Sequence, residues 1–244
     1  MPRFFLSAPI TVGETVTLTG DDARHISFSL RMAAGEEVTL LDGAGGVFRA
    51  RLCALDGTAV SAEITEKLPA EAESPLHIHL YQGYPKSDKL ELIVQKAVEL
   101  GVSDITPFES ERCVKRPKAD KLSHIAERQN RIALEAAKQC GRDRLPAVHT
   151  PISFAEMLRE ASAFPLCLFC YEGAGTRSMK DICLAHSDVR EIAVVVGSEG
   201  GFSPKEAEEA RAAGLAMTGL GKRILRCETA PLYVLSALSF FFEL

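Results

Sequence analysis

The spacing of apolar and polar residues changes near residue 70. Before that point, short stretches alternate between apolar and polar residues and are separated by Gly/Asp turns about every ten residues. Such spacing predicts a small antiparallel barrel, with strands over residues 15–19, 37–41, 47–52 and 59–64. Residues 21–32 interrupt the alternation and predict a short helix capped by Asp21 or Asp22.

After a polar, proline-bounded linker at 68–75, strand and helix patterns alternate. Continuous apolar runs at 166–171 and 192–196 are typical of strands covered on both faces, as in a parallel sheet. Apolar residues at helical spacing, together with shorter apolar runs, predict helices over 87–100, 118–138 and 231–242 and strands over 76–81 and 105–108. The sequence therefore predicts an α/β protein with two domains, residues 1–70 and 75–244.

Charge is distributed unevenly along the 244 residues. The net charge of −5 excludes a uniformly basic nucleic-acid coat protein. Residues 112–144, however, contain ten Lys/Arg against four Asp/Glu. A solvated helix face accounts for such a run as well as a polyanionic partner does, so both interpretations stay open.

No apolar run approaches the roughly 20 residues that a membrane span needs, and the N-terminus lacks the pattern of a secretion signal. The seven cysteines are scattered and odd in number, which favours a reduced, cytoplasmic protein. Cys167 and Cys170 have C-x-x-C spacing but lie in an apolar strand without two further ligands nearby. We therefore expect no membrane association and no metal.

The sharpest local motif is a glycine-rich loop at 197–202 between an apolar strand and a helix. Ser203 predicts the helix cap, Pro204 its first position and Glu206 a capping box. Glycines let a backbone approach a ligand closely, and ligands of open α/β sheets bind beyond the carboxyl ends of the strands. The loop matches neither a P-loop nor the dinucleotide fingerprint. It predicts either a ligand loop or a tight structural turn.

A second motif, at 220–231, places Lys222, Arg223 and Arg226 shortly before a predicted helix start at Thr229 or Ala230. A helix N-terminus favours anions. The alternative is an ordinary loop whose arginines pair with acidic surface residues.

Together these segments resemble a known family. Gly197-Ser-Glu-Gly-Gly-Phe202 and Leu220-Gly-x-x-Ile-Leu-Arg-x-Glu-Thr-Ala230 resemble the two signature loops of the bacterial 16S rRNA uridine-N3 methyltransferases, the RsmE type within the SPOUT superfamily. Further matching segments follow the family's order along the chain, at Arg3-Phe4, 25–31, 42–45, 95–101, 107–112 and 135–142. The chain departs from the family's usual residues at Lys138, Cys140, Ser198 and Cys227.

The resemblance implies a PUA-like barrel over residues 1–70 and, over 75–244, an α/β SPOUT methyltransferase domain with a deep trefoil knot that binds S-adenosylmethionine. It also implies a homodimer that methylates one uridine of 16S rRNA. The charge distribution favours an assembled small ribosomal subunit as the substrate. Two alternatives stay open: an RNA-binding assembly factor without catalysis, and a methyltransferase for another RNA such as tRNA.

The resemblance also assigns candidate site residues. The expected cofactor-binding residues are Glu172, Gly197, Ser198, Glu199, Gly200, Gly201, Leu220, Gly221, Ile224, Leu225 and Arg226. Uridine N3 carries a proton, so a cation that stabilises the developing anion would help, and Arg142 and Arg226 are the candidates. Candidates for RNA phosphate contacts are Arg3, Arg31, Lys86, Lys115 and Arg116. Cys227 as a nucleophile is a minor alternative.

Overall fold

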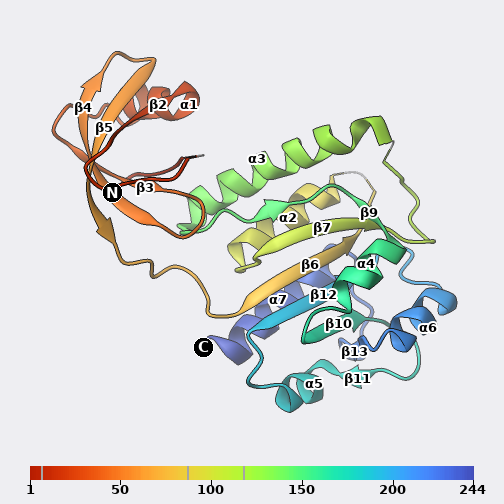
Figure 1. Cartoon of the computed structure of the whole chain (residues 1–244). Helices are drawn as coiled ribbons and strands as arrows, with labels where there is room; N and C mark the ends of the chain where they lie inside the picture. Colours follow the sequence, from red (N-terminus) through yellow and green to blue (C-terminus); the bar gives the residue numbers. More distant parts are fainter. Residues whose placement is uncertain (7, 87, 118) are drawn as a thin grey trace. The chain divides into compact units, whose positions relative to one another are not determined.

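The computed structural model describes residues 1–6, 8–86, 88–117 and 119–244. The chain forms two compact units. The first comprises residues 1–73 and 137–145, and the second comprises residues 74–136 and 146–244. The chain therefore leaves the second unit and returns to it once, as the colours of Figure 1 allow the reader to follow.

The first unit is built on a five-stranded sheet with the order β1-β3-β4-β5-β2. All four predicted strands are present, and β4 and β5 run further than predicted. Among the described strand pairs, β1–β3 is parallel and the other three are antiparallel. Alternate apolar residues of the strands, such as Leu18 and Val38, pack with Ala23 and Ile26 into one core. The strands are β1 (Arg3–Phe5), β2 (Thr15–Thr19), β3 (Glu37–Leu41), β4 (Val47–Leu55) and β5 (Ala59–Leu68).

The helix predicted over 21–32 is shorter and begins earlier. It consists of α1 (Gly20–Arg24) and one π-helical segment (His25–Ser29). The predicted cap by Asp21 or Asp22 is wrong. Thr19 occupies the cap position without a side-chain bond, and both aspartates lie in the first turn, where the positive end of the helix favours acidic side chains. The helix cannot continue to residue 32 because Arg31 has a φ of 53°.

The second unit is built on a parallel sheet with the order β11-β13-β10-β12-β6-β7-β8, and β9 also pairs with β7. All strand pairs among the described residues of this sheet are parallel, as the continuous apolar runs predict. The strands are β6 (His77–Gly83), β7 (Asp104–Glu109), β8 (Ala147–Val148), β9 (Ile152–Ser153), β10 (Leu166–Cys170), β11 (Arg177–Ser178), β12 (Glu191–Val196) and β13 (Ala216–Gly219).

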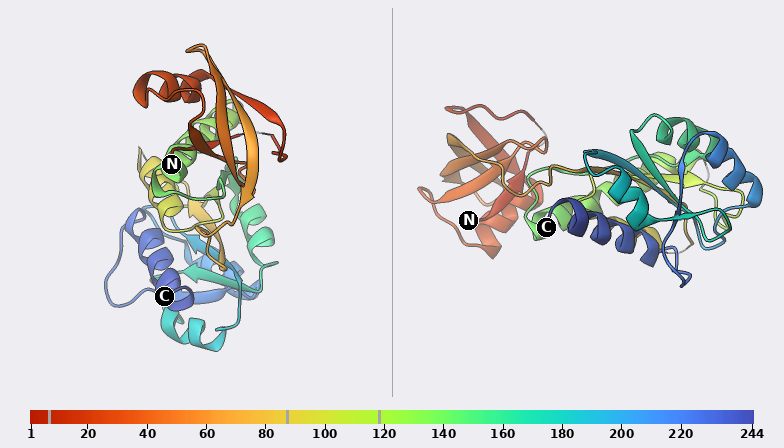
Figure 2. Two further views of the ribbon diagram at one scale, coloured as in Figure 1. Left: turned by 90° about the vertical axis from the view of Figure 1, so that its left-hand side faces the viewer. Right: turned by 90° about the horizontal axis from the view of Figure 1, so that it is seen from below.

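Helices cover both faces of this sheet (Figures 1 and 2). Helix α7 packs against α2, β6 and β12. On the opposite face, Met157 of α4 and Ala207 of α6 share a core with Phe169 and Val195. The predicted starts at residues 87 and 118 lie outside the described residues. The helices are α2 (Lys89–Glu99), a short 3-10 helix (Ala119–Lys121), α3 (Leu122–Cys140), α4 (Phe154–Ala161), α5 (Met179–Ala185), α6 (Pro204–Ala212) and α7 (Thr229–Phe242).

Two connections cross at the carboxyl ends of the central strands. The chain from β10 to β11 passes β13, because β11 pairs with the outer edge of β13. The chain from β13 to α7 passes back across β10 to reach β12 and β6. At the crossing, a Cβ on Gly219 would lie 3.0 Å from Thr176 Oγ1. Such a crossing is what the expected trefoil knot requires.

None of the helices in the described ranges is both long enough and apolar enough to cross a bilayer.

Candidate functional site

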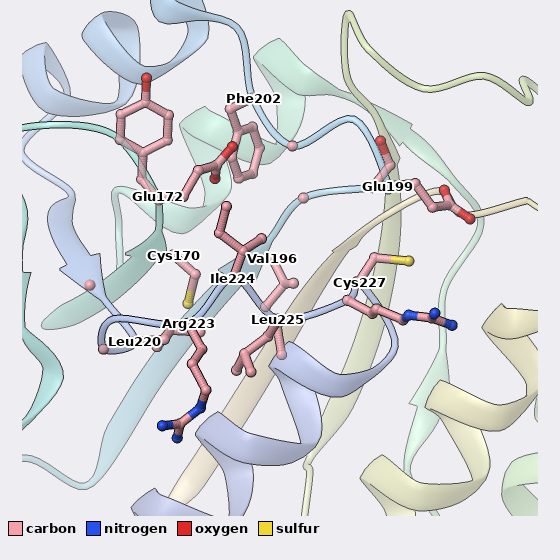
Figure 3. A pocket seen from close by; sticks show the side chains of 18 of the residues that line it. Cys170, Glu172, Val196, Glu199, Phe202, Leu220, Arg223, Ile224, Leu225 and Cys227 are labelled. Carbon is pink, nitrogen blue, oxygen red and sulfur yellow. The ribbon is translucent and has the colours of Figure 1, made fainter.

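A cavity of about 510 Å³ lies in the second unit where β10, β12 and β13 end (Figure 3). Residues 196–199, 201–202 and 219–227, which come from the two motif loops and their flanks, form most of its lining, and Lys89, Glu172 and Ala230 add to it. The three strands are parallel neighbours, so their carboxyl ends meet at one edge of the sheet. Two loops that are about twenty residues apart in the sequence therefore face one pocket.

The pocket brings together every expected cofactor-binding residue except Gly200. Gly200 is instead packed against the neighbouring loop, where an added Cβ would lie 2.9 Å from the carbonyl oxygen of Arg112. The expected residues that line the pocket are Glu172, Gly197, Ser198, Glu199, Gly201, Leu220, Gly221, Ile224, Leu225 and Arg226.

The glycine-rich loop is a tight turn as well as a pocket wall. The N–H of Gly201 donates to the carbonyl of Ser198 at 2.9 Å. Gly201 has a φ of 62°, and a Cβ there would lie 2.6 Å from Glu172 Oε1. A side chain at this position would therefore be strained and would also collide with a carboxylate of the pocket. The predicted helix cap is confirmed, since Ser203 and Glu206 form the capping box of α6.

The end of β6 contacts the glycine-rich loop and holds it in place. Gln82, which is fully buried, donates from Nε2 to the carbonyl of Gly197 at 3.2 Å. Gly83 allows close contact, because a Cβ there would lie 2.4 Å from the backbone nitrogen of Ser198. The buried Ser198 Oγ has no partner among the described residues. Since unpaired buried polar atoms are rare, a polar ligand group in the pocket fits this position.

Lys89, at the start of α2, links the two loops and was not expected from the sequence. Its Nζ lies 3.2 Å from Glu199 Oε1 in the first loop and 3.0 Å from Glu228 Oε2 after the second. The carboxylates raise the pKa of Lys89, Glu228 foremost. The pKa values of Glu199 and Glu228 are lowered, because backbone N–H groups and Lys89 outweigh burial. A lysine in the first turn of a helix opposes the helix dipole, which was the available sequence signal.

Cys227 is a protonated thiol in this site. Burial, followed by the hydrogen bond to Glu228 and the nearby carboxylates, raises its pKa to about 12. Its Sγ donates to Glu228 Oε2 at 3.2 Å. A thiol is a weak nucleophile until it loses its proton, so this environment opposes the nucleophile interpretation.

The two candidate catalytic arginines have different environments. Arg226 lies on the rim of the pocket with a side chain that is 83% exposed, and its Nη1 is 4.0 Å from Glu228 Oε1. Arg142 belongs to the first unit and is buried. Its Nε and Nη2 donate to the Glu73 carboxylate at 3.1 and 2.6 Å. Arg142 is not among the residues that line the pocket.

The candidate RNA-contact residues fall in both units. Arg3 and Arg31 belong to the first unit, where Arg3 is ion-paired with Asp143. Lys86, Lys115 and Arg116 belong to the second unit and are exposed. The pocket lining includes none of these five residues.

The basic segment at 112–144 divides into two kinds of surface. On α3, Arg128 is ion-paired with Glu91, and Lys138 lies 2.9 Å from Asp22 Oδ1. In the loop before α3, by contrast, Arg112, Lys115 and Arg116 form no ion pair in the part of the chain that the structure describes. The solvated-face interpretation therefore fits the helix better than the loop.

No cluster of three His, Cys, Asp or Glu side chains suited to a metal occurs in the described ranges. Cys167 and Cys170 are free thiols buried in β10, and burial raises the pKa of both.

Comparisons with known proteins bear on the whole chain. The model of the RNA methyltransferase domain family matches residues 72–239, and that of the RNA methyltransferase PUA domain matches residues 18–65. The ribosomal RNA small subunit methyltransferase E of Bacillus subtilis is 33% identical over 100% of this chain and 98% of its own. That of Synechocystis is 34% identical over 99% of this chain and 78% of its own.

Solved structures agree with the sequence comparisons. The ribosomal RNA small subunit methyltransferase E of Neisseria gonorrhoeae, bound to S-adenosyl methionine, has a TM-score of 0.85 and 35% identity over 98% of this chain and 97% of its own. A Legionella pneumophila methyltransferase with bound SAM has a TM-score of 0.86 and 32% identity over 98% and 96%. The fold class expected from the sequence, a PUA-like barrel followed by an α/β SPOUT domain, is confirmed. The chain belongs to the ribosomal RNA small subunit methyltransferase E family, the RsmE type of the SPOUT superfamily.

Proposed function

We propose that this protein transfers a methyl group from S-adenosylmethionine to N3 of one specific uridine in 16S rRNA. The observation that carries the proposal is the convergence of the two signature loops on one pocket at the carboxyl edge of the parallel sheet. We assign residues 1–70 to an RNA-holding barrel and residues 75–244 to the methyltransferase domain, except that residues 137–145 group with the barrel.

The pocket residues fit S-adenosylmethionine, which supplies an electrophilic methyl group when bound. Close-packed glycines expose backbone groups to the cavity, and the unpaired Ser198 Oγ offers a hydrogen bond. Apolar side chains such as Val196 and Leu225 can cover a flat aromatic base. The Glu172 carboxylate can accept hydrogen bonds from hydroxyl or ammonium groups. The proposed cofactor-binding residues are those expected from the sequence, with Gly200 acting through loop packing.

The reacting nitrogen must be exposed and must lose a proton. N3 faces the pairing partner in a duplex, so the protein has to bind an unpaired or displaced uridine. A cation near the rim stabilises the negative charge that develops on the base. We assign this task to Arg226, which is exposed at the rim, and retain Arg142 as a second candidate whose ion pair with Glu73 would first have to open.

The remaining assignments concern partners. We propose that Arg3, Arg31, Lys86, Lys115 and Arg116 contact RNA phosphates, which position the substrate without reading its sequence. We also propose that the protein acts as a homodimer in the cytoplasm and that the substrate is an assembled small ribosomal subunit. Equal methylation of naked rRNA and intact subunits would contradict the last point.

The test is transfer of labelled methyl from S-adenosylmethionine to small ribosomal subunits from a strain that lacks the modification, followed by nucleoside mass analysis. A 3-methyluridine product confined to 16S rRNA is expected, with a large loss in Arg226→Ala. A different methylated nucleoside, or transfer only to tRNA, would overturn the proposed acceptor. Cofactor binding without transfer to any RNA would favour the assembly-factor alternative.

A further inference from the structure

The loop whose cations form no ion pair among the described residues is attached to the glycine-rich loop of the proposed cofactor pocket. It follows β7 and contains Arg112, Lys115 and Arg116 against the single carboxylate of Glu111; residues 110–116 are called the basic loop below. All residues involved belong to the second unit. Two contacts of the basic loop itself and one contact of Phe108, just before it in the chain, make the attachment.

The first contact is a hydrogen bond from a cation to the glycine-rich loop. Arg112 Nη1 donates to the carbonyl oxygen of Gly200 at 3.2 Å. The two backbones also touch, because a Cβ on Gly200 would lie 2.8 Å from Arg112 Cβ and 2.9 Å from its carbonyl oxygen. Gly200 therefore has no room for a side chain while the basic loop is in place.

The second contact joins the basic loop to the helix that follows the glycine-rich loop. The N–H of Glu111 donates to Glu206 Oε1 at 2.7 Å. The other oxygen, Glu206 Oε2, accepts the N–H of Ser203 in the capping box of α6 at 2.9 Å. Glu206 is 5% exposed, so its carboxylate is largely shielded from water and would be costly to leave without these two donors.

The third contact is aromatic. Phe202, the last residue of the glycine-rich motif, is buried and stacks on Phe108 with ring centroids 6.2 Å apart. Phe108 lies two residues before the start of the basic loop. Two hydrogen bonds between Ser110 and Cys113 close the basic loop. The N–H of Ser110 donates to Cys113 Sγ at 3.3 Å, and the N–H of Cys113 donates to the carbonyl oxygen of Ser110 at 3.1 Å. The basic loop is thus a compact turn and not a free strand of chain.

We infer that the basic loop couples RNA binding to cofactor binding, with Arg112 as the positioning residue that transmits the coupling. The inference rests on the proposed function, since it takes the pocket as the cofactor site and the loop cations as phosphate contacts. RNA phosphates neutralise the loop cations and hold the basic loop in the conformation that supports the Gly200 carbonyl. By thermodynamic linkage, a bound cofactor that orders the glycine-rich loop strengthens RNA binding by the same factor.

The coupling is measured by equilibrium binding of labelled S-adenosylhomocysteine, which cannot transfer a methyl group, with and without small ribosomal subunits that lack the modification. For the wild-type protein we expect the subunits to tighten binding about fivefold or more. In Arg112→Ala the factor is expected to fall to about one. Lys115→Ala removes the same charge without a contact to Gly200, so it should weaken RNA binding and leave the factor near that of the wild type.

A second variant perturbs the same contact from the other loop. Gly200→Ala should push the loops apart and lower the coupling factor, and thermal melting checks that both variants remain folded. A wild-type factor of one, or a factor that survives in Arg112→Ala, would overturn the inference while methyl transfer by the wild-type protein still supported the proposed function. Absence of both cofactor binding and transfer in the wild type would overturn the two together.

Discussion

At the scale of single residues, Lys89 joins the two loops of the pocket. Its ammonium is the cation that the Glu199 and Glu228 carboxylates share, and these carboxylates belong to different loops. Ion pairs between exposed groups contribute little each, but this cation connects two loops that line one pocket. The residue therefore matters for the geometry of the pocket more than for the stability of the fold.

Lys89→Met is expected to weaken cofactor binding by about three- to tenfold, because the two carboxylates lose their common counter-ion. Isothermal titration calorimetry with S-adenosylmethionine checks this. Lys96→Met is the matched control, since Lys96 lies on the same helix and pairs within it with Glu99 at 2.8 Å. Equal affinities for the two variants would show that the shared ion pair does not shape the pocket.

Cys227→Ser is expected to keep methyl transfer within about threefold of the wild type, because a thiol with a pKa of about 12 carries almost no thiolate near neutral pH. Labelled-methyl transfer at pH 7.5 measures the effect. A covalent-catalysis role would instead require a loss of several orders of magnitude in this variant.

At the scale of elements, the helix after the glycine-rich loop is the clearest case of local sequence deciding local structure. Ser203, Pro204 and Glu206 predict the start of α6, and the structure confirms it. The cap of α1 was not predictable in this way, because two adjacent aspartates offered competing cap positions. The sequence also did not indicate the φ of 64° that Gly20 adopts at the start of this helix. Cap residues therefore predict where a helix starts only when the sequence offers a single suitable cap position.

Ser203→Ala should destabilise the protein by about 1 kcal/mol through loss of the cap and should also weaken cofactor binding. Ser153→Ala is a matched control, because Ser153 forms the same capping box on α4, which contributes no residue to the pocket lining. Chemical denaturation and calorimetry on both variants separate the two effects. If both variants weaken cofactor binding equally, the cap of α6 has no special connection with the pocket.

The parallel sheet contains a pH-sensitive contact between strands. His79 Nδ1 of β6 lies 2.7 Å from Asp104 Oδ2 of β7, and its Nε2 lies 3.4 Å from Glu191 Oε1 of β12. Burial alone would lower the pKa of His79, but Asp104 and then Glu191 outweigh it, so the pKa is raised. The stabilisation is complete below the pKa of the unfolded chain and is lost as pH rises through the higher folded value.

His79→Gln is therefore expected to cost about 1–3 kcal/mol at pH 6, and the cost should shrink by pH 9. Urea denaturation at both pH values measures the difference from the wild type. His186→Gln serves as the control, because His186 Nδ1 lies 2.9 Å from the backbone carbonyl oxygen of Ile182 and His186 forms no ion pair with any described carboxylate. A cost that grows with pH would contradict the assignment.

The sequence predicted the loops of the pocket better than the residues that contact these loops from other elements. Glycine spacing and cap residues are local signals, so residues 197–202 and 220–227 could be identified directly. Gln82, Lys89 and Arg112 reach these loops from β6, α2 and the loop after β7, and only the folded chain brings them together. The environment of Arg142 was equally hidden, since its partner Glu73 is 69 residues away in the chain.

At the scale of the whole molecule, a cluster of bonds joins two distant segments of the first unit. The Glu73 carboxylate accepts a hydrogen bond from Arg142 Nη2 at 2.6 Å. It also accepts the backbone N–H groups of Asp143 and Arg144, both at 2.9 Å. The Asp143 carboxylate in turn accepts the N–H groups of Glu71 and Ala72 at 3.0 Å. Residues 71–73 of the predicted linker are therefore held in place.

Glu73→Ala should destabilise the protein by about 3 kcal/mol, because it leaves the buried Arg142 charge without this carboxylate. Denaturation followed by circular dichroism measures the loss. The double variant Glu73→Ala, Arg142→Met should recover part of it, since the buried charge is also removed. A double variant no more stable than the single one would argue against burial of the arginine charge as the cause.

The same cluster decides how the barrel can be handled in protein engineering. Residues 137–145 complete the first unit although more than sixty residues of the second unit separate them from residue 73. A gene fragment that stops at residue 73 encodes Glu73 and Arg3 without Arg142 and Asp143. Residues 1–73 alone therefore do not make up the whole first unit. A chimera that exchanges this unit between relatives has to exchange residues 137–145 as well. Exchanging only the first segment would separate Glu73 and Arg3 from the Arg142 and Asp143 partners with which they evolved.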